Sequence, residues 1–242
     1  MAGGAVRIGT SGWHYKHWLG PFYPEKLPAS RMLEFYTRHF DTVELNNTFY
    51  RLPGENRVDT WRDSTPQGFC FSAKGSRFLT HMKKLKDAET GIERFFERID
   101  PLGAKLGPVV FQLPPNWEAD AGRLEGFLRA LPKWHRYAFE LRNPTWHNET
   151  IYQILRKYNV AFCIFEIAGF VSERHITADF TYVRLHGPGG AYQGSYTQEV
   201  LGGWAGQIAE WRKHLDAIHV YFDNDQAGFA VENALALKRM VG

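Results

Sequence analysis

Residues 162–165 read Phe-Cys-Ile-Phe, a short run that is apolar at every position. A strand that is apolar on both faces is typical of a parallel sheet covered by helices. Eight short apolar runs recur along the chain, at Val6–Gly9, Thr42–Leu45, Phe69–Ala73, Pro108–Leu113, Tyr137–Leu141, Ala161–Phe165, Tyr182–Leu185 and Ile218–Phe222. Helical patterning lies between most of them. The sequence therefore predicts an α/β protein with a single (β/α)8 TIM-barrel domain over residues 1–242.

Two connections and one loop depart from a regular strand–helix repeat. Only residues 168–179 separate the sixth and seventh expected strands, which predicts an irregular or short sixth helix. The longest connection, residues 77–107, is expected to contain additional structure before its main helix. Residues 187–197 read Gly-Pro-Gly-Gly-Ala-Tyr-Gln-Gly-Ser-Tyr-Thr and predict a flexible loop over the barrel mouth that could act as a lid.

The composition limits the class of protein. A net charge of +3, from 29 basic and 26 acidic residues, lacks the strong basic excess of a dedicated nucleic-acid-binding domain. Cys70 and Cys163 lie inside expected strands without a neighbouring Cys or His, which predicts buried free thiols in a reducing compartment and argues against a zinc site. Because no apolar segment reaches the length of a signal or a membrane span, we expect a cytoplasmic protein with no membrane partner.

Polar residues stand at the carboxyl ends of the expected strands, where TIM barrels carry their active sites. Three strands end in polar pairs spaced two residues apart, Glu44 with Asn46, Glu140 with Arg142, and Arg184 with His186. Residues two apart share one face of a strand, and the apolar residues between them face the helices. The pairs should therefore converge near the barrel axis. Other strand ends add Lys74, Gln112, Asp223 and Asn224.

The residue types in this set indicate acid–base chemistry on an anion. Carboxylates and imidazole can exchange protons near neutral pH, so the expected catalytic residues are Glu140, His186, Glu44 and Asp223. Cations suit carboxylate or phosphate, and aromatic rings can stack on a base or a sugar. The expected substrate-binding residues are Lys74, Arg142, Arg184, Asn46, Gln112, Asn224, Trp13 and Tyr15. The competing interpretation is an internal salt-bridge network, because buried charges need partners whatever the function.

Several function classes fit the same residues. The leading hypothesis is an enzyme, a hydrolase or a lyase or isomerase, that acts on a small phosphorylated or nucleotide-like anion without a cofactor. A metal-assisted phosphoester hydrolase, with nucleic acid as an alternative partner, would place one divalent cation among Glu44, Glu140, His186 and Asp223, where basic neighbours would repel it. A glycoside hydrolase would use Glu44 and Glu140. A non-catalytic binding protein would use the same site without turnover.

Several motifs, in order along the chain, resemble one known family. They are Gly9-Thr-Ser-Gly-Trp-His-Tyr15, Val43-Glu-Leu-Asn46, Phe111-Gln-Leu-Pro-Pro115, Glu140-Leu-Arg142, Arg184-Leu-His-Gly187 and Tyr221-Phe-Asp-Asn224. Together they resemble the YecE-like family, domain of unknown function seventy-two, from about residue 7 to residue 237. The resemblance implies a TIM barrel and supplies no reaction. Asp223 stands where the family pattern has Asn and could add a ligand or base, and Asn143 stands where His is more usual.

Overall fold

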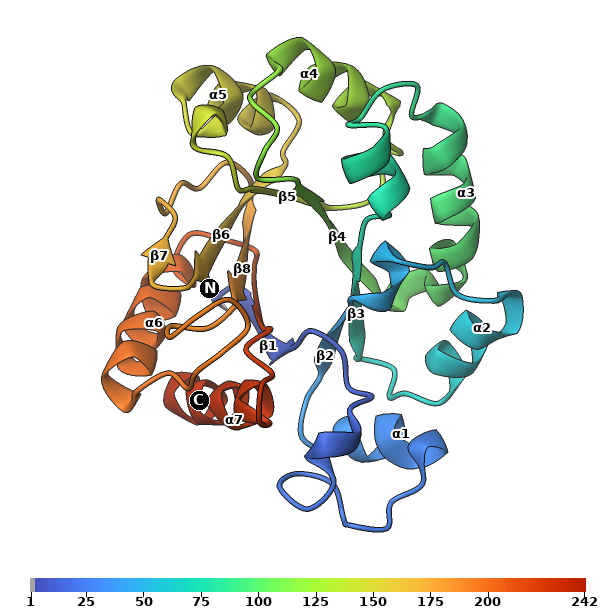
Figure 1. The fold of residues 1–242 in the computed structure, drawn as a ribbon, viewed down its shortest axis with the longest axis vertical. Helices are drawn as coiled ribbons and strands as arrows, with labels where there is room; N and C mark the ends of the chain where they lie inside the picture. The colour runs from blue at the N-terminus through green and yellow to red at the C-terminus, as the bar shows by residue number, and fades with distance from the viewer. Residues whose placement is uncertain (1–2) are drawn as a thin grey trace.

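A ring of parallel strands surrounded by helices forms the core of the protein, in a computed structural model that describes residues 3–242 (Figure 1). The ring consists of β1 (Ala5–Thr10), β2 (Thr42–Leu45), β3 (Cys70–Lys74), β4 (Leu106–Leu113), β5 (Tyr137–Leu141), β6 (Ala161–Ile167), β8 (Phe180–Leu185) and β9 (Ala217–Phe222). Neighbours pair in the order β1-β9-β8-β6-β5-β4-β3-β2, and each of the eight predicted apolar runs overlaps one of these strands. The predicted TIM barrel is confirmed.

The helices pack outside the ring (Figure 1). They are α1 (Met32–Tyr36), α2 (Glu55–Asp63), α3 (Glu89–Ile99), α4 (Ala121–Ala130), α5 (Glu149–Lys157), α6 (Gln198–Trp211) and α7 (Phe229–Val241). Side chains cap three of them: Asp120, Asn148 and Thr197 each accept a hydrogen bond from the backbone N–H three residues later. Among residues 3–242, no helix has the length and apolar character needed to cross a bilayer.

The spacing predicted an irregular or short sixth helix, and the structure has an irregular connection without a helix over residues 168–179. After β6 the chain turns at Ala168 and Gly169, which both have positive φ, and β7 (Phe170–Val171) pairs antiparallel with β6. Residues 172–179 then lead to β8 without regular structure. The long connection after β3 holds a π-helical turn, Phe78–Met82, before α3, so the additional structure expected there is also present.

Alternation along each strand divides side chains between the helical shell and the barrel interior. On β8, Val183 and Leu185 join the large outer cluster, whereas Tyr182 belongs to an inner cluster. Because Arg184 follows Tyr182 by two residues, it shares the interior face. The two cysteines are free thiols; Cys163 is buried inside the barrel, while Cys70 is half-buried rather than fully buried.

The barrel closes between β1 and β2 without a regular ladder. Ser11 and Glu44 form one isolated parallel bridge, in which the Gly12 N–H donates to the Glu44 carbonyl at 2.8 Å. Below it, the Tyr36 hydroxyl accepts from the Thr10 N–H at 3.1 Å and donates to the Thr42 carbonyl at 3.0 Å. A helix side chain therefore replaces the missing backbone hydrogen bonds. We call this closure the β1–β2 seam.

Candidate functional site

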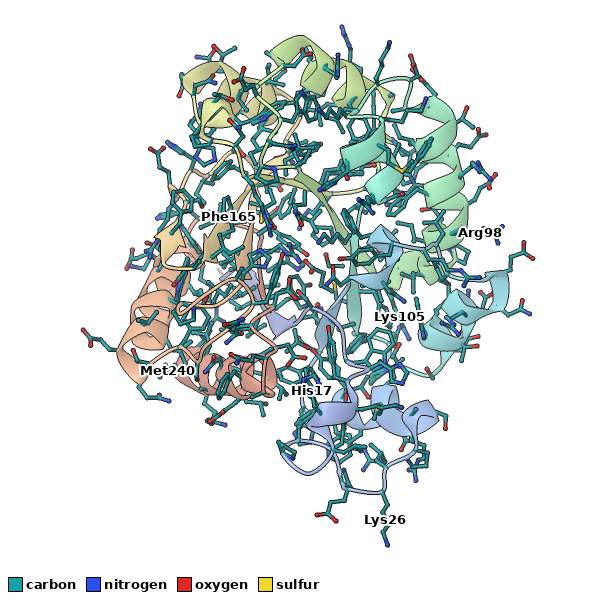
Figure 2. The ribbon with its side chains drawn as sticks, viewed as in Figure 1. His17, Lys26, Arg98, Lys105, Phe165 and Met240 are labelled. Carbon is teal, nitrogen blue, oxygen red and sulfur yellow. The ribbon has the colours of Figure 1, made fainter. Side chains whose placement is uncertain are left out.

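Arg184 lies at the centre of a buried ion-pair network at the carboxyl ends of the strands. Its register partner on β6 is Phe165, which is labelled in Figure 2. The fully buried guanidinium donates to both oxygens of Glu44 at 2.7 and 3.0 Å, to Glu140 Oε2 at 2.6 Å and to Asp223 Oδ2 at 3.2 Å. Three of the predicted catalytic residues, from β2, β5 and the end of β9, thus meet on one side chain. We call this set the Arg184 network.

Glu44 has no remaining hydrogen-bonding capacity for a ligand. Besides its two contacts with Arg184, Oε1 accepts from the Ser11 hydroxyl at 2.7 Å and Oε2 accepts from the Tyr182 hydroxyl at 2.7 Å. The side chain is fully buried. Four hydrogen bonds occupy the four lone-pair sites of a carboxylate. Glu44 therefore holds Arg184 in place, and the internal salt-bridge interpretation applies to this pair.

His186 joins the network and is placed to move a proton. Its Nδ1 lies 3.1 Å from Asp223 Oδ2, and its Nε2 lies 3.3 Å from both Glu140 Oε2 and Arg142 Nη2. Asp223 can accept from Nδ1–H, which leaves Nε2 facing Glu140 and Arg142. The arrangement resembles a general base held by an orienting carboxylate.

The two neighbouring carboxyl groups stay ionised. Burial alone raises the pKa of Glu140, but the positive charges of Arg142 and Arg184 outweigh it and hold that pKa well below its usual value. Burial likewise raises the pKa of Asp223, and the hydrogen bond from His186 with the charge of Arg184 brings it below its usual value. Near neutral pH these groups accept hydrogen bonds, so His186 is the group in the network suited to proton transfer.

Tyr192 covers His186. Its ring meets the imidazole edge-on with centroids 5.4 Å apart, and its hydroxyl lies 3.4 Å from both terminal nitrogens of Arg142. Tyr192 has a φ of +65°, an unusual conformation for a non-glycine residue, and its N–H donates to the His186 carbonyl at 2.6 Å. The loop of residues 187–197 therefore lies over the barrel mouth, where the sequence placed it.

Lys74 ends β3 and has no acidic partner. Its side chain is 5% exposed, its ammonium lies 4.4 Å from the centroid of the Phe49 ring, and among residues 3–242 no acceptor lies within hydrogen-bonding distance. Burial and the charge of Arg184 lower the pKa of Lys74 to about 8. Burial also lowers the pKa of His81, and the charges of Lys74, Arg77 and Arg142 lower it further. Positive charge is therefore concentrated at this side of the mouth.

The remaining predicted binding residues lie in different surroundings. Asn224 donates to the Gly194 carbonyl and to Asn233 Oδ1, both at 2.8 Å, so it anchors the 187–197 loop. Gln112 is buried, and in the described part of the chain its side chain has no hydrogen bond. Trp13, Tyr15 and Asn46 line a cleft of about 890 Å³ between the loop after β1 and helices α1 and α2. That cleft contains no member of the Arg184 network.

A second cleft, of about 750 Å³, has no counterpart in the sequence analysis. Four arginines line it: Arg51, Arg57, Arg94 and Arg98, the last of which is labelled in Figure 2. Sequence reasoning also missed the contacts of Ser11 and Tyr182 with Glu44. The signal for Tyr182 was present, because it precedes Arg184 by two residues and so shares its face.

The described part of the chain contains no cluster of side chains suited to bind a metal ion. Within residues 3–242, no three His, Cys, Asp or Glu side chains gather in a metal-binding arrangement. Arg184 and Arg142 already pair with the carboxylates that the metal-assisted alternative would need. That alternative has no ligand set in the described part of the chain.

The fold and the site define a TIM-barrel protein with a buried, charged site at the carboxyl ends of its strands, the end at which such barrels carry their chemistry. The chain matches the model of the family described as "Protein of unknown function DUF72" over residues 7–242. It belongs to that family, which confirms the resemblance found in the sequence.

Relatives and solved structures agree with this assignment. The protein YunF of Bacillus subtilis is 25% identical over 94% of this chain and 92% of its own length. YecE of Escherichia coli K12 is 31% identical over 57% of this chain and 49% of its own length, so the match spans about half of that relative. A DUF72 family structure from Thermotoga maritima has a TM-score of 0.89 at 28% identity and covers 98% of this chain and 99% of that one. A DUF72 family structure from Enterococcus faecalis, at 19% identity, has a TM-score of 0.84 over 98% of this chain and 95% of that one, and shows the same fold.

Proposed function

We propose that this protein is an enzyme that carries out acid–base chemistry on a small carboxylate- or phosphate-bearing molecule at the barrel mouth. The observation that carries the proposal is the position of His186 Nε2, 3.3 Å from Arg142 Nη2 while Asp223 holds the other ring nitrogen at 3.1 Å. A proton carrier thus lies beside a guanidinium suited to an anion.

Arg142 is the guanidinium with capacity for a ligand. Its Nε donates to Glu140 Oε1 at 2.5 Å, whereas within residues 3–242 its terminal nitrogens have only long contacts, 3.4 Å to the Tyr192 hydroxyl and 3.3 Å from Nη2 to His186 Nε2. Its side chain is 13% exposed, whereas that of Arg184 is fully buried. An anion that displaced the tyrosine hydroxyl would gain two charge-assisted hydrogen bonds in place of two weak ones.

The proposal divides the predicted site residues into two roles. His186 exchanges the proton, and Arg142 and Lys74 supply positive charge to the ligand. Glu44, Glu140, Asp223 and Arg184 position these groups through the Arg184 network. The glycoside hydrolase alternative has less support, because it requires a carboxyl group that donates a proton. Glu140 has a strongly lowered pKa, and Glu44 has four hydrogen bonds.

Entry of a ligand requires movement of Tyr192, because its ring covers His186 and its hydroxyl occupies Arg142. Residues at active-site lids commonly move in this way to sequester the reaction from water. The ligand's anionic group would take the place of the Tyr192 hydroxyl.

A thermal-shift screen followed by turnover assays tests the proposal. The panel contains phosphorylated sugars, nucleotides, 2-oxo acids and dicarboxylates, and each hit is incubated with the protein and analysed for product. A ligand at 100 times its Kd stabilises by about 2.7 kcal/mol, which is several degrees in Tm for a chain of this size. We expect a shift that Arg142→Gln abolishes, and that Arg129→Gln, at an exposed position on α4, retains.

The variants separate the alternatives. His186→Asn should retain binding and lose turnover. An anion-induced shift that survives in Arg142→Gln would contradict the site. Binding by wild-type protein without turnover of any hit would favour the non-catalytic binding protein, and a response confined to divalent metals would favour the metal-assisted hydrolase.

A further inference from the structure

Lys74 carries a buried amine that no acidic group within residues 3–242 pairs with. Lysines below the surface are normally paired, as the half-buried Lys105 illustrates in the same protein (labelled in Figure 2). The Lys105 ammonium donates to the backbone carbonyls of Arg62 and Thr65 and to the Thr65 hydroxyl. Lys74 is more buried, at 5% exposure, yet within residues 3–242 its ammonium has no hydrogen bond or ion pair and lies over the face of the Phe49 ring. A charged ammonium is unfavourable in such surroundings.

The surroundings of Lys74 favour the neutral amine. Burial and the charge of Arg184 bring its pKa to about 8, so near neutral pH the neutral amine is roughly two orders of magnitude more abundant than in an ordinary lysine. For a lysine that only supplied charge to an anion, a lowered pKa would be of no benefit, because it makes the charge easier to lose. A neutral amine is instead the form of lysine that acts as a nucleophile.

We propose that Lys74 forms an imine with the aldehyde or ketone group of the anionic substrate. The inference rests on the proposed function, because it uses the same mouth: Arg142 takes the anionic group and Lys74 reacts with the carbonyl carbon. The substrate class is then an anionic carbonyl compound, either a 2-oxo acid or a phosphorylated aldehyde or ketone. The position fits a barrel enzyme, since Lys74 is the last residue of β3 and follows by two residues Ser72, whose hydroxyl contacts Tyr182 in the barrel interior.

The step balances without an oxidant or reductant. The Lys74 nitrogen forms a bond to the carbonyl carbon, the C=O π pair moves to oxygen, and that oxygen takes a proton. The nitrogen loses a proton, a second proton reaches the hydroxyl group, and the C–O bond breaks to release water as the C=N bond forms. His186 is the group that exchanges these protons under the proposed function.

The network also suits the product of the step. The charges of Glu140, Asp223 and Glu44 act on Lys74 in the direction that favours a positive charge on its nitrogen, although burial and Arg184 outweigh them. A protonated imine places that positive charge on the same nitrogen. The charges of the three carboxylates therefore act in the direction that favours the iminium form, which is the form that activates the adjacent carbon.

Reductive trapping tests the proposal. The full-length protein is incubated at about pH 8 with pyruvate or, separately, with pyridoxal 5′-phosphate, reduced with sodium borohydride, and analysed by intact mass and peptide mapping. We expect one adduct, on Lys74, that is absent from Lys74→Arg and Lys74→Met. Lys83→Met is the matched control, because Lys83 also lies over a phenylalanine ring, Phe78 at 5.8 Å, but is exposed. Its adduct yield should equal that of the wild type.

The two probes distinguish the substrate classes, and Lys74→Arg separates failure of the imine from failure of the anion site. An adduct with pyruvate alone supports a 2-oxo acid, and one with pyridoxal 5′-phosphate alone supports a phosphorylated carbonyl compound. Modification spread over exposed lysines with Lys74 unmodified, or no adduct with either probe, overturns the imine. Lys74→Arg keeps a positive charge but cannot form the imine. If an anion still causes a thermal shift in Lys74→Arg, and Arg142→Gln abolishes that shift, the anion site is supported even when the imine is not. If neither a shift nor an adduct occurs with any anion, the proposed function fails as well.

Discussion

At the scale of single residues, Arg184 and Lys74 differ in how their buried positive charges are paired. Arg184 contacts three carboxylates, and Lys74 contacts none. A buried charge with partners is costly to remove, because the partners are left unpaired. A buried charge without partners is costly to keep. The two residues therefore predict stability changes of opposite sign.

Replacing Arg184 with Met should destabilise the protein strongly. The change leaves Glu44, Glu140 and Asp223 without their shared cation, and breaking a buried pair typically costs about 3–5 kcal/mol. Urea unfolding would measure the loss as a lower midpoint. Arg38→Met removes an exposed contact with Glu34 at 2.6 Å and should lower the midpoint little, because solvent screens exposed ion pairs. Similar losses in the two variants would contradict the central place of Arg184.

Replacing Lys74 with Met should raise the free energy of unfolding near pH 7. The folded lysine has a pKa of about 8, below that of the unfolded chain, so the unfolded state binds the proton more tightly between about pH 8 and 10.5. Wild-type stability consequently rises with pH across that window, and the advantage of Lys74→Met should shrink. Urea unfolding at neutral and alkaline pH tests this, with Lys83→Met as control. A Lys74→Met protein less stable than wild type at pH 7 would refute it.

Strand alternation predicted which residues meet in the site, but not how they pair. Glu44, Glu140, Arg184, His186 and Asp223 all converge, as the two-residue period implied. The period fixes the face of a strand, whereas pairing depends on rotamers and on the stagger between strands. For that reason the sequence left Glu44 as a catalytic candidate, and only its four hydrogen bonds show that it holds Arg184.

At the scale of elements, the 187–197 loop depends on Gly187. Gly187 has a φ of +110°, and a Cβ there would lie 2.2 Å from the Gln193 carbonyl oxygen. Gly187→Ala should therefore displace the loop and lift Tyr192 from His186. We expect faster amide hydrogen exchange across residues 187–197 and a loss of about 1–3 kcal/mol.

A glycine in α6 supplies the control for this prediction. A Cβ at Gly206 would meet nothing within 4 Å, and the residue is exposed in the helix interior. Gly206→Ala should stabilise the protein by about 0.5–1 kcal/mol. Unchanged exchange in the 187–197 loop of Gly187→Ala would mean that the close contact is relieved elsewhere. The glycine-rich composition predicted the loop, but it could not predict that Tyr192 adopts positive φ above His186.

At the scale of the whole molecule, acid should destabilise the barrel through its interior. Burial, together with the charges of Arg7 and Arg136, lowers the pKa of His219 to about 3. The unfolded chain therefore binds more protons at this residue between about pH 6.5 and 3, and stability falls by about 1.4 kcal/mol per pH unit in that window. The lowered pKa values of Glu140 and Asp223 add a further loss as these groups protonate in acid.

Thermal unfolding from about pH 8 to 4.5 measures this dependence. His219→Gln removes the titrating group, so its Tm should fall less steeply than that of the wild type. His214→Gln, at an exposed position after α6, should retain the wild-type slope. Equal slopes in all three proteins would exclude a contribution from His219.

Local patterns predicted the architecture because the apolar runs and the spacing of residues 168–179 are local features. The closure of the barrel is not local. It depends on Tyr36, a helix residue whose hydroxyl reaches Thr10 and Thr42. The 890 and 750 Å³ clefts likewise combine residues from separate connections. Such long-range contacts have no signature in a strand-by-strand reading.

The Gly12 amide in the β1–β2 seam should report on ligand binding at the barrel mouth. Glu44 accepts the Gly12 N–H through its backbone, and its side chain accepts from the Ser11 hydroxyl and from Arg184, so separation of the seam should be coupled to disruption of the network. Local opening between β1 and β2 and disruption of the Arg184 network should then occur in the same opening event. A molecule bound at the mouth should slow deuterium uptake at the Gly12 amide. Exchange at this one amide would therefore detect ligand binding without an assay of turnover.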